Sequence, residues 1–416
     1  MKKISLITLL FSLVIAATSE ARTRKVLFIG NSYTYTNNMP LILQNMAAAM
    51  GDTLVYDESD PGGYTLNQHS TYPTTITKIF SNQWDVVVIH EQSQMPSFPP
   101  AQVMTDVYPY ATRLDSMVHA NDTCTQTMFM MTWGHANGDP MNCPGYPAIC
   151  TYDGMQQRLR ESYMEMGATN HAAVAPVGMA FKIMIDSAYS PWLISADSSH
   201  PVVAGSYLEA AVLYGSIFHK HVLNCTYTSG LSATDAHLLQ RVADKVVFDS
   251  LSLWQGPGHY PYAGFTTAVV GMGATLTSQS VEPGSHTWNF GDATTDTAAN
   301  PAHTYSSVGT YTVTHTITTD CFTETATATV QIGTTGLADL ANVGLNVMQP
   351  QGDGIVRFDV HMYNGDELSL TDMSGRTVRK YNLATLPATD QLTPGVYIYR
   401  LSSADGHVQV GKVAVY

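Results

Sequence analysis

The run Val86-Val87-Val88-Ile89 constrains the fold of this chain more than any other feature. Its four β-branched residues leave no polar face, so the segment Trp84 to His90 is predicted to be a central strand that is buried on both sides. Further short strands are predicted at residues 25–29, 125–133 and 172–176. Helical patterns occur at residues 39–50, 101–119, 154–167, 203–218 and 233–253. Such alternation predicts an α/β domain with helices covering both faces of a parallel sheet.

A chain of 416 residues is too long to fold around one ordinary hydrophobic core, so it is predicted to contain two or three domains. The α/β unit spans residues 22–256, and a Gly/Pro-rich linker begins at Gly256. From about residue 262 the chain is rich in Thr and Val, and residues 311–317 alternate polar and apolar side chains as a half-buried strand does. A second break lies near Gly333–Gly336. Two small β-sandwich domains are therefore predicted, at 262–333 and 340–416.

The N-terminus has the pattern of an export signal. Lys2 and Lys3 precede an apolar run from Ile4 to Ala17, and Ser19-Glu20-Ala21 forms a cleavage site of small residues. Residues 1–21 are therefore predicted to be a signal peptide that is removed on export. The run is shorter than the ~20 apolar residues that span a bilayer, so no transmembrane segment is expected after its removal.

Charge and cysteine content limit the partners and the compartment. The formal net charge of −14 argues against nucleic-acid binding, which needs Lys and Arg to neutralise phosphates. Export permits disulfides, and Cys143 and Cys150 bracket a Pro/Gly-rich loop that they can close. An odd count leaves at least one thiol without an intrachain partner. The other pairings stay open among the five cysteines, which are Cys124, Cys143, Cys150, Cys225 and Cys321. Their spacing and that of the histidines fit no metal-ligand pattern, so no metal or other cofactor is expected.

The segment Gly30-Asn31-Ser32-Tyr33 follows the first predicted strand and precedes a helix. A Ser in this place projects from the strand end, and its backbone N–H lies at a helix start, where it can stabilise an oxyanion. Such turns are common in α/β proteins, so this motif alone is weak evidence for catalysis.

The segment Ser195 to Pro201 contains Asp197 and His200, three residues apart. A carboxylate at this spacing can orient the imidazole and stabilise its charged form, as a catalytic triad requires. The structural alternative is that Asp197 caps a helix and His200 is a surface residue.

Two further segments lie between these motifs. Gly62-Gly63 follows the expected end of a second strand, where a glycine lets the backbone N–H approach an oxyanion, although Gly-Gly also suits a plain turn. His90-Glu91-Gln92-Ser93-Gln94 begins where the Val-rich strand ends. Polar side chains at this edge of a parallel sheet are expected to belong to a binding site.

The order Ser, Gly, polar segment after a strand, and Asp-x-x-His resembles the SGNH hydrolases, the GDSL-type esterases and lipases, over residues 25–220. The resemblance implies a three-layer αβα fold of flavodoxin-like type. It also implies Ser32 as nucleophile, with Asp197 and His200 completing the triad, and the backbone N–H groups of Ser32 and Gly63 in the oxyanion hole.

One block departs from the family pattern. The third block of the family normally carries Gly-x-Asn, whose Asn side chain completes the oxyanion hole, and this chain has no Asn there. Gln92 is the predicted donor, because its amide N–H can serve the same purpose on a longer stem. Gln94 and His90 stay open as alternatives.

Thr132-Trp133-Gly134-His135 ends another predicted strand at the same sheet edge. Trp133 can stack on a sugar ring or line the acyl pocket, and His135 can contact substrate. A half-buried aromatic with a structural role is an equal alternative for Trp133.

The two terminal modules resemble known families. Trp288 to Asp292, Pro301 to Tyr305 and Val308 to Val313 resemble the PKD-type domain, an immunoglobulin-like sandwich, in which the Trp and Asp are interpreted as fold determinants. Residues 340–416, with Leu370 to Arg376 and Leu392 to Tyr397, resemble the C-terminal sorting domain of the type IX secretion system of Bacteroidetes. The usual Pro-Asn-Pro is replaced by Met348-Gln349-Pro350-Gln351.

These resemblances imply a secreted or cell-surface serine esterase that removes acetyl or other short acyl groups from a polysaccharide. Its partners would be an acylated polysaccharide or small ester and the type IX secretion machinery. A lipase or general short-chain esterase, and a non-catalytic glycan-binding or adhesion protein with the same fold, are the alternatives. Whether the mature protein is released or surface-anchored stays open.

Overall fold

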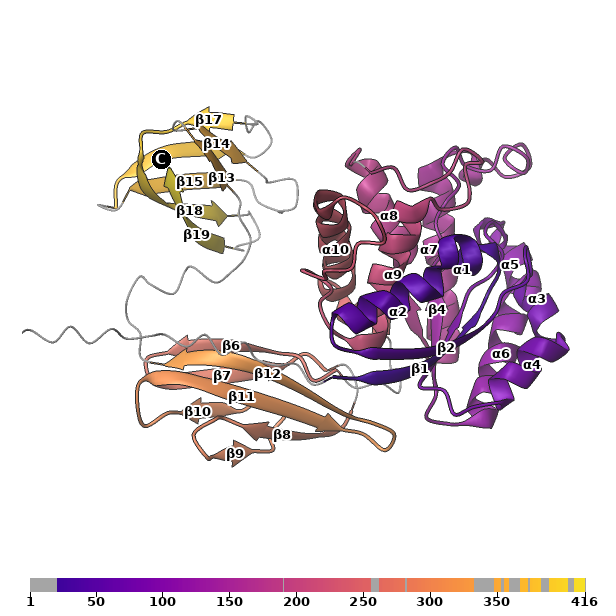
Figure 1. The fold of residues 1–416 in the computed structure, drawn as a ribbon, viewed down its shortest axis with the longest axis horizontal. Helices are drawn as coiled ribbons and strands as arrows, with labels where there is room; N and C mark the ends of the chain where they lie inside the picture. The colour runs from indigo at the N-terminus through magenta and orange to yellow at the C-terminus, as the bar shows by residue number, and fades with distance from the viewer. Residues whose placement is uncertain are drawn as a thin grey trace, which may run out of the picture. The chain divides into compact units, whose positions relative to one another are not determined.

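The computed structural model describes most of the chain after Glu20. The described residues are 21–189, 191–255, 262–280, 283–332, 348–352, 355–358, 367–372, 375–382, 389–402 and 408–415. The predicted signal peptide, the linker from Gly256 and the break near Gly333–Gly336 lie outside these ranges, apart from Ala21. The chain divides into two compact units (Figure 1). The first runs to Ala268 and also takes in Ala274–His303 and Thr310–Val330, and the second takes in Val269–Gly273, Thr304–Gly309 and the segments after Val330.

A five-stranded parallel sheet forms the centre of the α/β domain. Its strand order is β2-β1-β3-β4-β5, the flavodoxin-like order. The strands are β1 Thr23–Ile29, β2 Thr53–Ser59, β3 Val86–Ile89, β4 Gln126–Met130 and β5 Ala173–Ala175. All four residues of β3 are buried, as the apolar run predicts.

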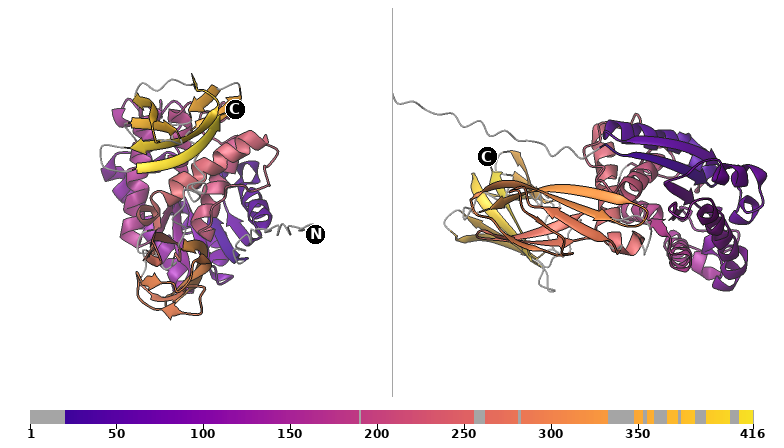
Figure 2. Two further views of the ribbon diagram at one scale, coloured as in Figure 1. Left: turned by 90° about the vertical axis from the view of Figure 1, so that its left-hand side faces the viewer. Right: turned by 90° about the horizontal axis from the view of Figure 1, so that it is seen from below.

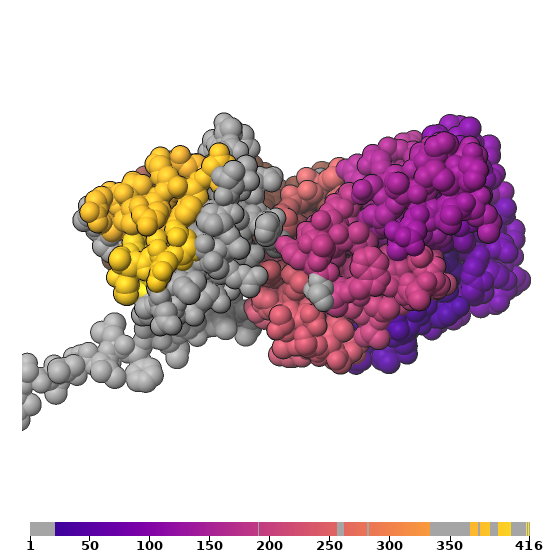
Figure 3. Space-filling model, turned by 90° about the horizontal axis from the view of Figure 1, so that it is seen from above, coloured from indigo at the N-terminus to yellow at the C-terminus, as the bar shows by residue number. Residues whose placement is uncertain are grey.

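Helices cover both faces of this sheet (Figures 1 and 2). Alternate residues of each strand face opposite sides, so Val86 and Val88 enter one hydrophobic cluster while Val87 and Ile89 enter the other. The first cluster contains side chains of α2 Met39–Ala49, α8 Val177–Asp186, α9 Val203–Phe218 and α10 Ala233–Phe248. The second contains side chains of α3 Leu66–His69, α4 Pro73–Phe80, α5 Pro100–Asp106, α6 Tyr108–Asn121 and α7 Tyr152–Asn170. The predicted three-layer α/β fold is confirmed, and Figure 3 shows the surface of this domain from one side.

Several element boundaries differ from the prediction. The predicted helix at 101–119 is two helices, which separate at Val107 because Pro109 cannot continue a helix that began upstream. The last predicted helix ends at Phe248 and is followed by α11 Leu251–Gln255. Helices α3, α4 and α8 were not predicted. The shorter elements are α1 Ser32–Tyr35 and the 3-10 turns Thr36–Asn38, Met95–Ser97 and Pro147–Ile149.

The β module after the linker has two antiparallel sheets, β10-β7-β6 and β12-β11-β8-β9. Its strands are β6 Phe265–Val270, β7 Gly273–Ser278, β8 Ser285–Asn289, β9 Thr295–Asp296, β10 Ala302–Thr304, β11 Gly309–Thr318 and β12 Thr323–Ile332. Trp288 is fully buried and stacks on His315 with ring centroids 3.8 Å apart. Asp292 bonds to His303 Nε2 at 2.7 Å. The packing of Trp288 and the bond from Asp292 agree with their interpretation as fold determinants.

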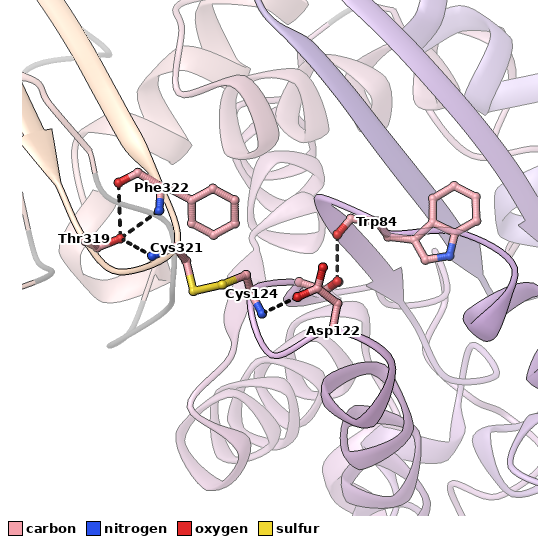
Figure 4. The surroundings of a disulfide bond; sticks show 7 residues. Trp84, Asp122, Cys124, Thr319, Cys321 and Phe322 are labelled. Carbon is pink, nitrogen blue, oxygen red and sulfur yellow. Dashed lines mark hydrogen bonds between the residues drawn. A yellow bond between two sulfur atoms is a disulfide. The ribbon is translucent and has the colours of Figure 1, made fainter.

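Disulfides close two loops within the first unit. One joins Cys143 to Cys150, as the sequence suggested. The other joins Cys124, in the loop before β4, to Cys321 in the turn between β11 and β12 (Figure 4). On either side of it, Asp122 Oδ1 accepts the Cys124 N–H at 2.9 Å, and Thr319 Oγ1 accepts the Cys321 N–H at 3.3 Å (Figure 4). Cys225 is a buried free thiol, which accounts for the odd count.

The second unit contains two antiparallel sheets after residue 347, in the orders β13-β14-β17 and β16-β15-β18-β19. Its strands are β13 Met348–Gly352, β14 Ile355–Phe358, β15 Glu367–Asp372, β16 Thr377–Asn382, β17 Thr389–Gln391, β18 Gly395–Ser402 and β19 Val408–Val415. Two antiparallel sheets agree with the predicted small β-sandwich. None of the helices in the described part of the chain combines the length and hydropathy of a membrane span.

Candidate active site

The predicted site residues follow the carboxyl ends of neighbouring strands. Ser32 follows β1, Gly63 follows β2, Gln92 follows β3 and His135 follows β4. Because these strands are adjacent and parallel, their carboxyl ends lie along one edge of the sheet. This is the edge at which open α/β sheets bind ligands.

His200 bonds to both other members of the predicted triad. Its Nε2 lies 2.8 Å from Ser32 Oγ, and its Nδ1 lies 2.7 Å from Asp197 Oδ2. With the proton on Nδ1, the imidazole donates to the carboxylate and accepts from the Ser32 hydroxyl. This is the hydrogen-bond geometry that nucleophile activation by a general base requires.

The loop from Ser195 to Pro201 holds Asp197 in place. Asp197 Oδ1 accepts from the Ser195 hydroxyl at 2.6 Å and from the backbone N–H groups of Ser199 and His200 at 2.9 and 3.0 Å. Burial would raise the pKa of Asp197, but the hydrogen bonds from Ser195, Ser199 and His200 outweigh it and hold this pKa well below its usual range. The following helix α9 has Val202 at its N-cap with no side-chain cap, so Asp197 does not act as a helix cap.

Two buried histidines support the turn that carries Ser32. His69 Nε2 bonds to the Gly30 carbonyl at 2.7 Å, and His90 Nε2 bonds to Thr34 Oγ1 at 2.8 Å. Burial lowers the pKa of each histidine to about 4, so both are neutral at neutral pH. His90 is 1% exposed and its Nδ1 bonds to the Glu91 carbonyl, so this side chain faces the core and not the predicted oxyanion hole.

Both glutamines proposed as oxyanion donors line the same cavity as Ser32, His200 and Gly63. The Gln92 amide is oriented by two hydrogen bonds, since its Oε1 accepts the Gln94 N–H at 3.2 Å and its Nε2 donates to Ser93 Oγ at 3.2 Å. An amide nitrogen carries two hydrogens, so one of them is accounted for by Ser93. Gly63 has a φ of +72°, which only glycine adopts without strain.

The cavity has a volume of about 430 Å³, within the range of small-molecule sites. None of the described residues that line it has an aliphatic side chain; they are Asn31, Ser32, Tyr33, Tyr35, Gly62, Gly63, Gln92, Ser93, Gln94, His135, Ser199 and His200. This composition suits a small polar ligand better than a long alkyl chain.

Trp133 and His135 have different roles although they are two residues apart. Trp133 is fully buried, stacks between Tyr33 and Phe181 at 4.3 and 4.2 Å, and donates to the Ser199 carbonyl. A sugar-stacking or pocket-lining role for Trp133 is therefore wrong, because its ring faces are already covered by protein. His135 does line the cavity, and its Nε2 lies 3.2 Å from the hydroxyls of Ser93 and Ser199.

Asn31, which lines the cavity, and Glu91, which lies beside it, had no role predicted from the sequence. Asn31 is 2% exposed and Glu91 is fully buried, and both bond to segments that line the cavity. For Glu91, the sequence offered one signal, its position: a charged residue directly after a buried strand lies at the edge of the sheet where ligands bind. Among the described residues, no group of three or more His, Cys, Asp or Glu side chains could hold a metal ion.

Comparison with family models confirms the predicted PKD-type domain. Residues 265–333 match the model described as PKD domain. The PKD1 domain of the Vibrio cholerae metalloprotease PrtV is 33% identical, covering 18% of this chain and 98% of its own length, with a TM-score of 0.17. A search of curated proteins gave no match to the chain.

Solved structures also resemble the α/β domain. A DUF4886 family protein from Bacteroides uniformis is 16% identical, covering 55% of this chain and 96% of its own, with a TM-score of 0.45. A putative SGNH hydrolase from Slackia heliotrinireducens is 25% identical, covering 46% of this chain and 97% of its own, with a TM-score of 0.39. The chain is thus similar over part of its length to a putative SGNH hydrolase, and its residues 265–333 match a PKD domain.

Proposed function

We propose that the α/β domain is a serine ester hydrolase that removes acetyl or other short acyl groups from a carbohydrate. The observation that carries the proposal is the hydrogen-bonded series Ser32 Oγ, His200 and Asp197, with contacts of 2.8 and 2.7 Å at the carboxyl edge of the sheet. Ser32 and His200 are 168 residues apart in the sequence, so the fold itself brings the three groups together.

In the proposed reaction, Ser32 Oγ attacks the ester carbonyl while His200 Nε2 takes its proton. The tetrahedral oxyanion is stabilised by the backbone N–H groups of Ser32 and Gly63 and by the Gln92 side-chain amide. His200 then protonates the leaving alcohol, which gives an acyl-enzyme. A water attacks this ester with His200 again as base, and the acid and free Ser32 are released.

The substrate class is proposed from the lining of the cavity. A short acyl group on a hydroxyl-rich alcohol fits about 430 Å³ of space without aliphatic side chains, and Gln94, His135 and Ser93 offer hydrogen bonds to sugar hydroxyls. A long-chain ester would leave these polar groups desolvated without partners.

The test is hydrolysis of p-nitrophenyl esters and of acetylated xylan by the full mature chain. Wild type should hydrolyse p-nitrophenyl acetate and release acetate from xylan, and Ser32→Ala and His200→Ala should each lose about 10⁴-fold or more in kcat. Ser116→Ala, an exposed serine on α6, is the matched control. Equal activity of wild type and Ser32→Ala would overturn the proposal. A preference for palmitate over acetate esters would overturn the substrate class alone.

The third oxyanion donor has its own test. We propose Gln92, and Gln92→Ala should lower kcat by about 10²-fold, as loss of one oxyanion donor does. Gln94→Ala should stay within a few-fold of wild type. The reverse pattern would assign the role to Gln94.

We also propose that residues 1–21 direct export and that residues 340–416 act as a type IX sorting domain. The support is the charged and apolar N-terminal pattern and the β-rich C-terminal unit. In a bacterium with this secretion system, the exported protein should begin at Arg22. Deletion of 340–416 should leave it in the periplasm, and export of the deleted form would contradict the assignment.

A further inference from the structure

Glu91 is a fully buried carboxyl group that the proposed reaction does not use. It directly follows His90 at the end of β3. Its two oxygens both lie 3.1 Å from the Leu66 N–H, and its Oε1 also accepts the Gln92 N–H at 2.7 Å. Each of these contacts is to backbone, so the carboxyl group fixes the course of the chain on two separate segments.

The two segments are the ones that carry the proposed oxyanion donors. Leu66 begins helix α3 and lies three residues after Gly63. Gln92 is the residue next to Glu91 itself. One side chain thus ties the loop after β2 to the loop after β3, across the width of β1.

Asn31 completes this connection from the turn that carries Ser32. Its Nδ2 donates to the Tyr64 carbonyl at 3.1 Å and to the Glu91 carbonyl at 3.4 Å, and its Oδ1 accepts the Tyr33 N–H at 3.3 Å. All three segments that would surround an oxyanion are therefore joined through Asn31 and Glu91.

We propose that Glu91 is a positioning residue, which holds the Gly63 loop and Gln92 at the separation that the tetrahedral intermediate requires. The inference rests on the proposed esterase function. Donors act on a transition state because they are already oriented when charge develops, so the groups that fix their geometry matter as much as the donors.

The environment of Glu91 also bears on its charge. Burial raises its pKa to about 8, against hydrogen bonds from Gln92 and Leu66 that lower it. The titratable groups nearby are His69 on α3, His90, and Tyr163 on α7, whose hydroxyl accepts the Glu91 N–H at 3.1 Å. Burial lowers the pKa of both histidines to about 4 and raises that of Tyr163, so all three are neutral between pH 6 and 9.

A neutral carboxyl group with its proton on Oε2 can still accept the Leu66 and Gln92 N–H groups through Oε1, without placing a negative charge beside the oxyanion. Above pH about 8 Glu91 ionises, and its charge opposes the developing negative charge on the substrate. Wild-type kcat for ester hydrolysis should therefore fall above this pH. Replacement of the carboxyl group by an amide removes the charge while keeping an acceptor oxygen.

The experiment measures kcat and KM for p-nitrophenyl acetate from pH 6 to 10, in the full mature chain. Glu91→Ala should lower kcat about 10²-fold with KM within a few-fold, because transition-state binding is lost and substrate binding is not. Glu91→Gln should recover at least about a tenth of wild-type kcat at pH 7 and should lack the fall above pH 8. Glu209→Ala, which removes another fully buried glutamate, is the matched control and should keep kcat within a few-fold.

The outcomes separate this inference from the function on which it rests. Equal rates for wild type and Ser32→Ala overturn both. Active wild type with an unchanged kcat in Glu91→Ala, or an equal loss in Glu209→Ala, overturns the inference alone. If Glu91→Ala does not fold, the pH profile of Glu91→Gln decides, since an alkaline fall that persists in this variant contradicts the proposal.

Discussion

Gly30 lies where the turn that carries Ser32 passes closest to His90. A β-carbon on Gly30 would lie 2.0 Å from His90 Nε2, 2.5 Å from its Cδ2 and 2.7 Å from Thr34 Oγ1, all within the 3.0 Å that real β-carbons essentially never cross. His90 and Thr34 are buried and bonded to each other at 2.8 Å. Neither side chain can move aside without leaving a polar atom unpaired.

The expected cost of Gly30→Ala follows from these contacts. Overpacking of a filled core costs about 1–3 kcal/mol, and an unsatisfied buried polar group adds about 1–3 kcal/mol. We expect the free energy of unfolding of the α/β domain to fall by about 2–6 kcal/mol in total. A shift of about 1 Å at Ser32 would also lower kcat about 10²-fold.

Circular dichroism during denaturant unfolding measures the first effect, and p-nitrophenyl acetate hydrolysis measures the second. Gly145→Ala is the control, because the nearest atom to its β-carbon would be 3.6 Å away. Its stability should stay within about 0.5 kcal/mol of wild type. Wild-type stability and kcat in Gly30→Ala would refute the view that His90 and Thr34 fix the turn.

Three further predictions concern groups elsewhere in the domain. Asp197→Asn should lower kcat about 10⁴-fold by disturbing the tautomer of the catalytic imidazole, and a loss below about tenfold in ester hydrolysis would contradict the triad. Glu209 is fully buried with no hydrogen-bond partner among the described residues, and burial raises its pKa well above the usual value. Its ionisation therefore favours the unfolded state as pH rises above about 4.5. Glu209→Met should raise the denaturant concentration at the unfolding midpoint, more at pH 8 than at pH 5. An unchanged midpoint would contradict the burial of an unpaired carboxyl group at this position. Replacing both cysteines of the Cys124–Cys321 disulfide by Ser, which opens a loop of 197 residues, should lower the free energy of unfolding by about 5 kcal/mol. The same change at Cys143–Cys150, which closes only 7 residues, should lower it by about 2 kcal/mol. Thermal unfolding of the two double variants tests this order.

The central strand and helix α9 could be predicted from sequence because nearly all of their side chains are buried. Val86–Ile89 is entirely apolar and Val203–Phe218 is mostly apolar, and both match the structure. β2 received no predicted bounds, because an edge strand is only partly buried and its residues alternate weakly. The break at Val107 was missed although Pro109 marks it.

The members of the candidate site were accessible from sequence, but their side-chain directions were not. The order of the four segments and its resemblance to a known family pointed to Asp197 and His200. His200 bonds to both Asp197 and Ser32, as a catalytic triad requires. Trp133 and His90 lie at strand ends too, yet both face the core. Which way a residue faces just after a strand depends on the turn that follows, and no periodicity applies there.

The central claim is that Ser32 is an activated nucleophile, and covalent labelling tests it without assuming a substrate. The mature chain is treated with a fluorophosphonate, and intact-mass and peptide mass spectrometry locate the adduct. One phosphonyl group per chain should appear on the peptide that contains Ser32, disappear in Ser32→Ala and form far more slowly in His200→Ala. No adduct in the folded wild type, or an adduct that persists in Ser32→Ala, would contradict the account.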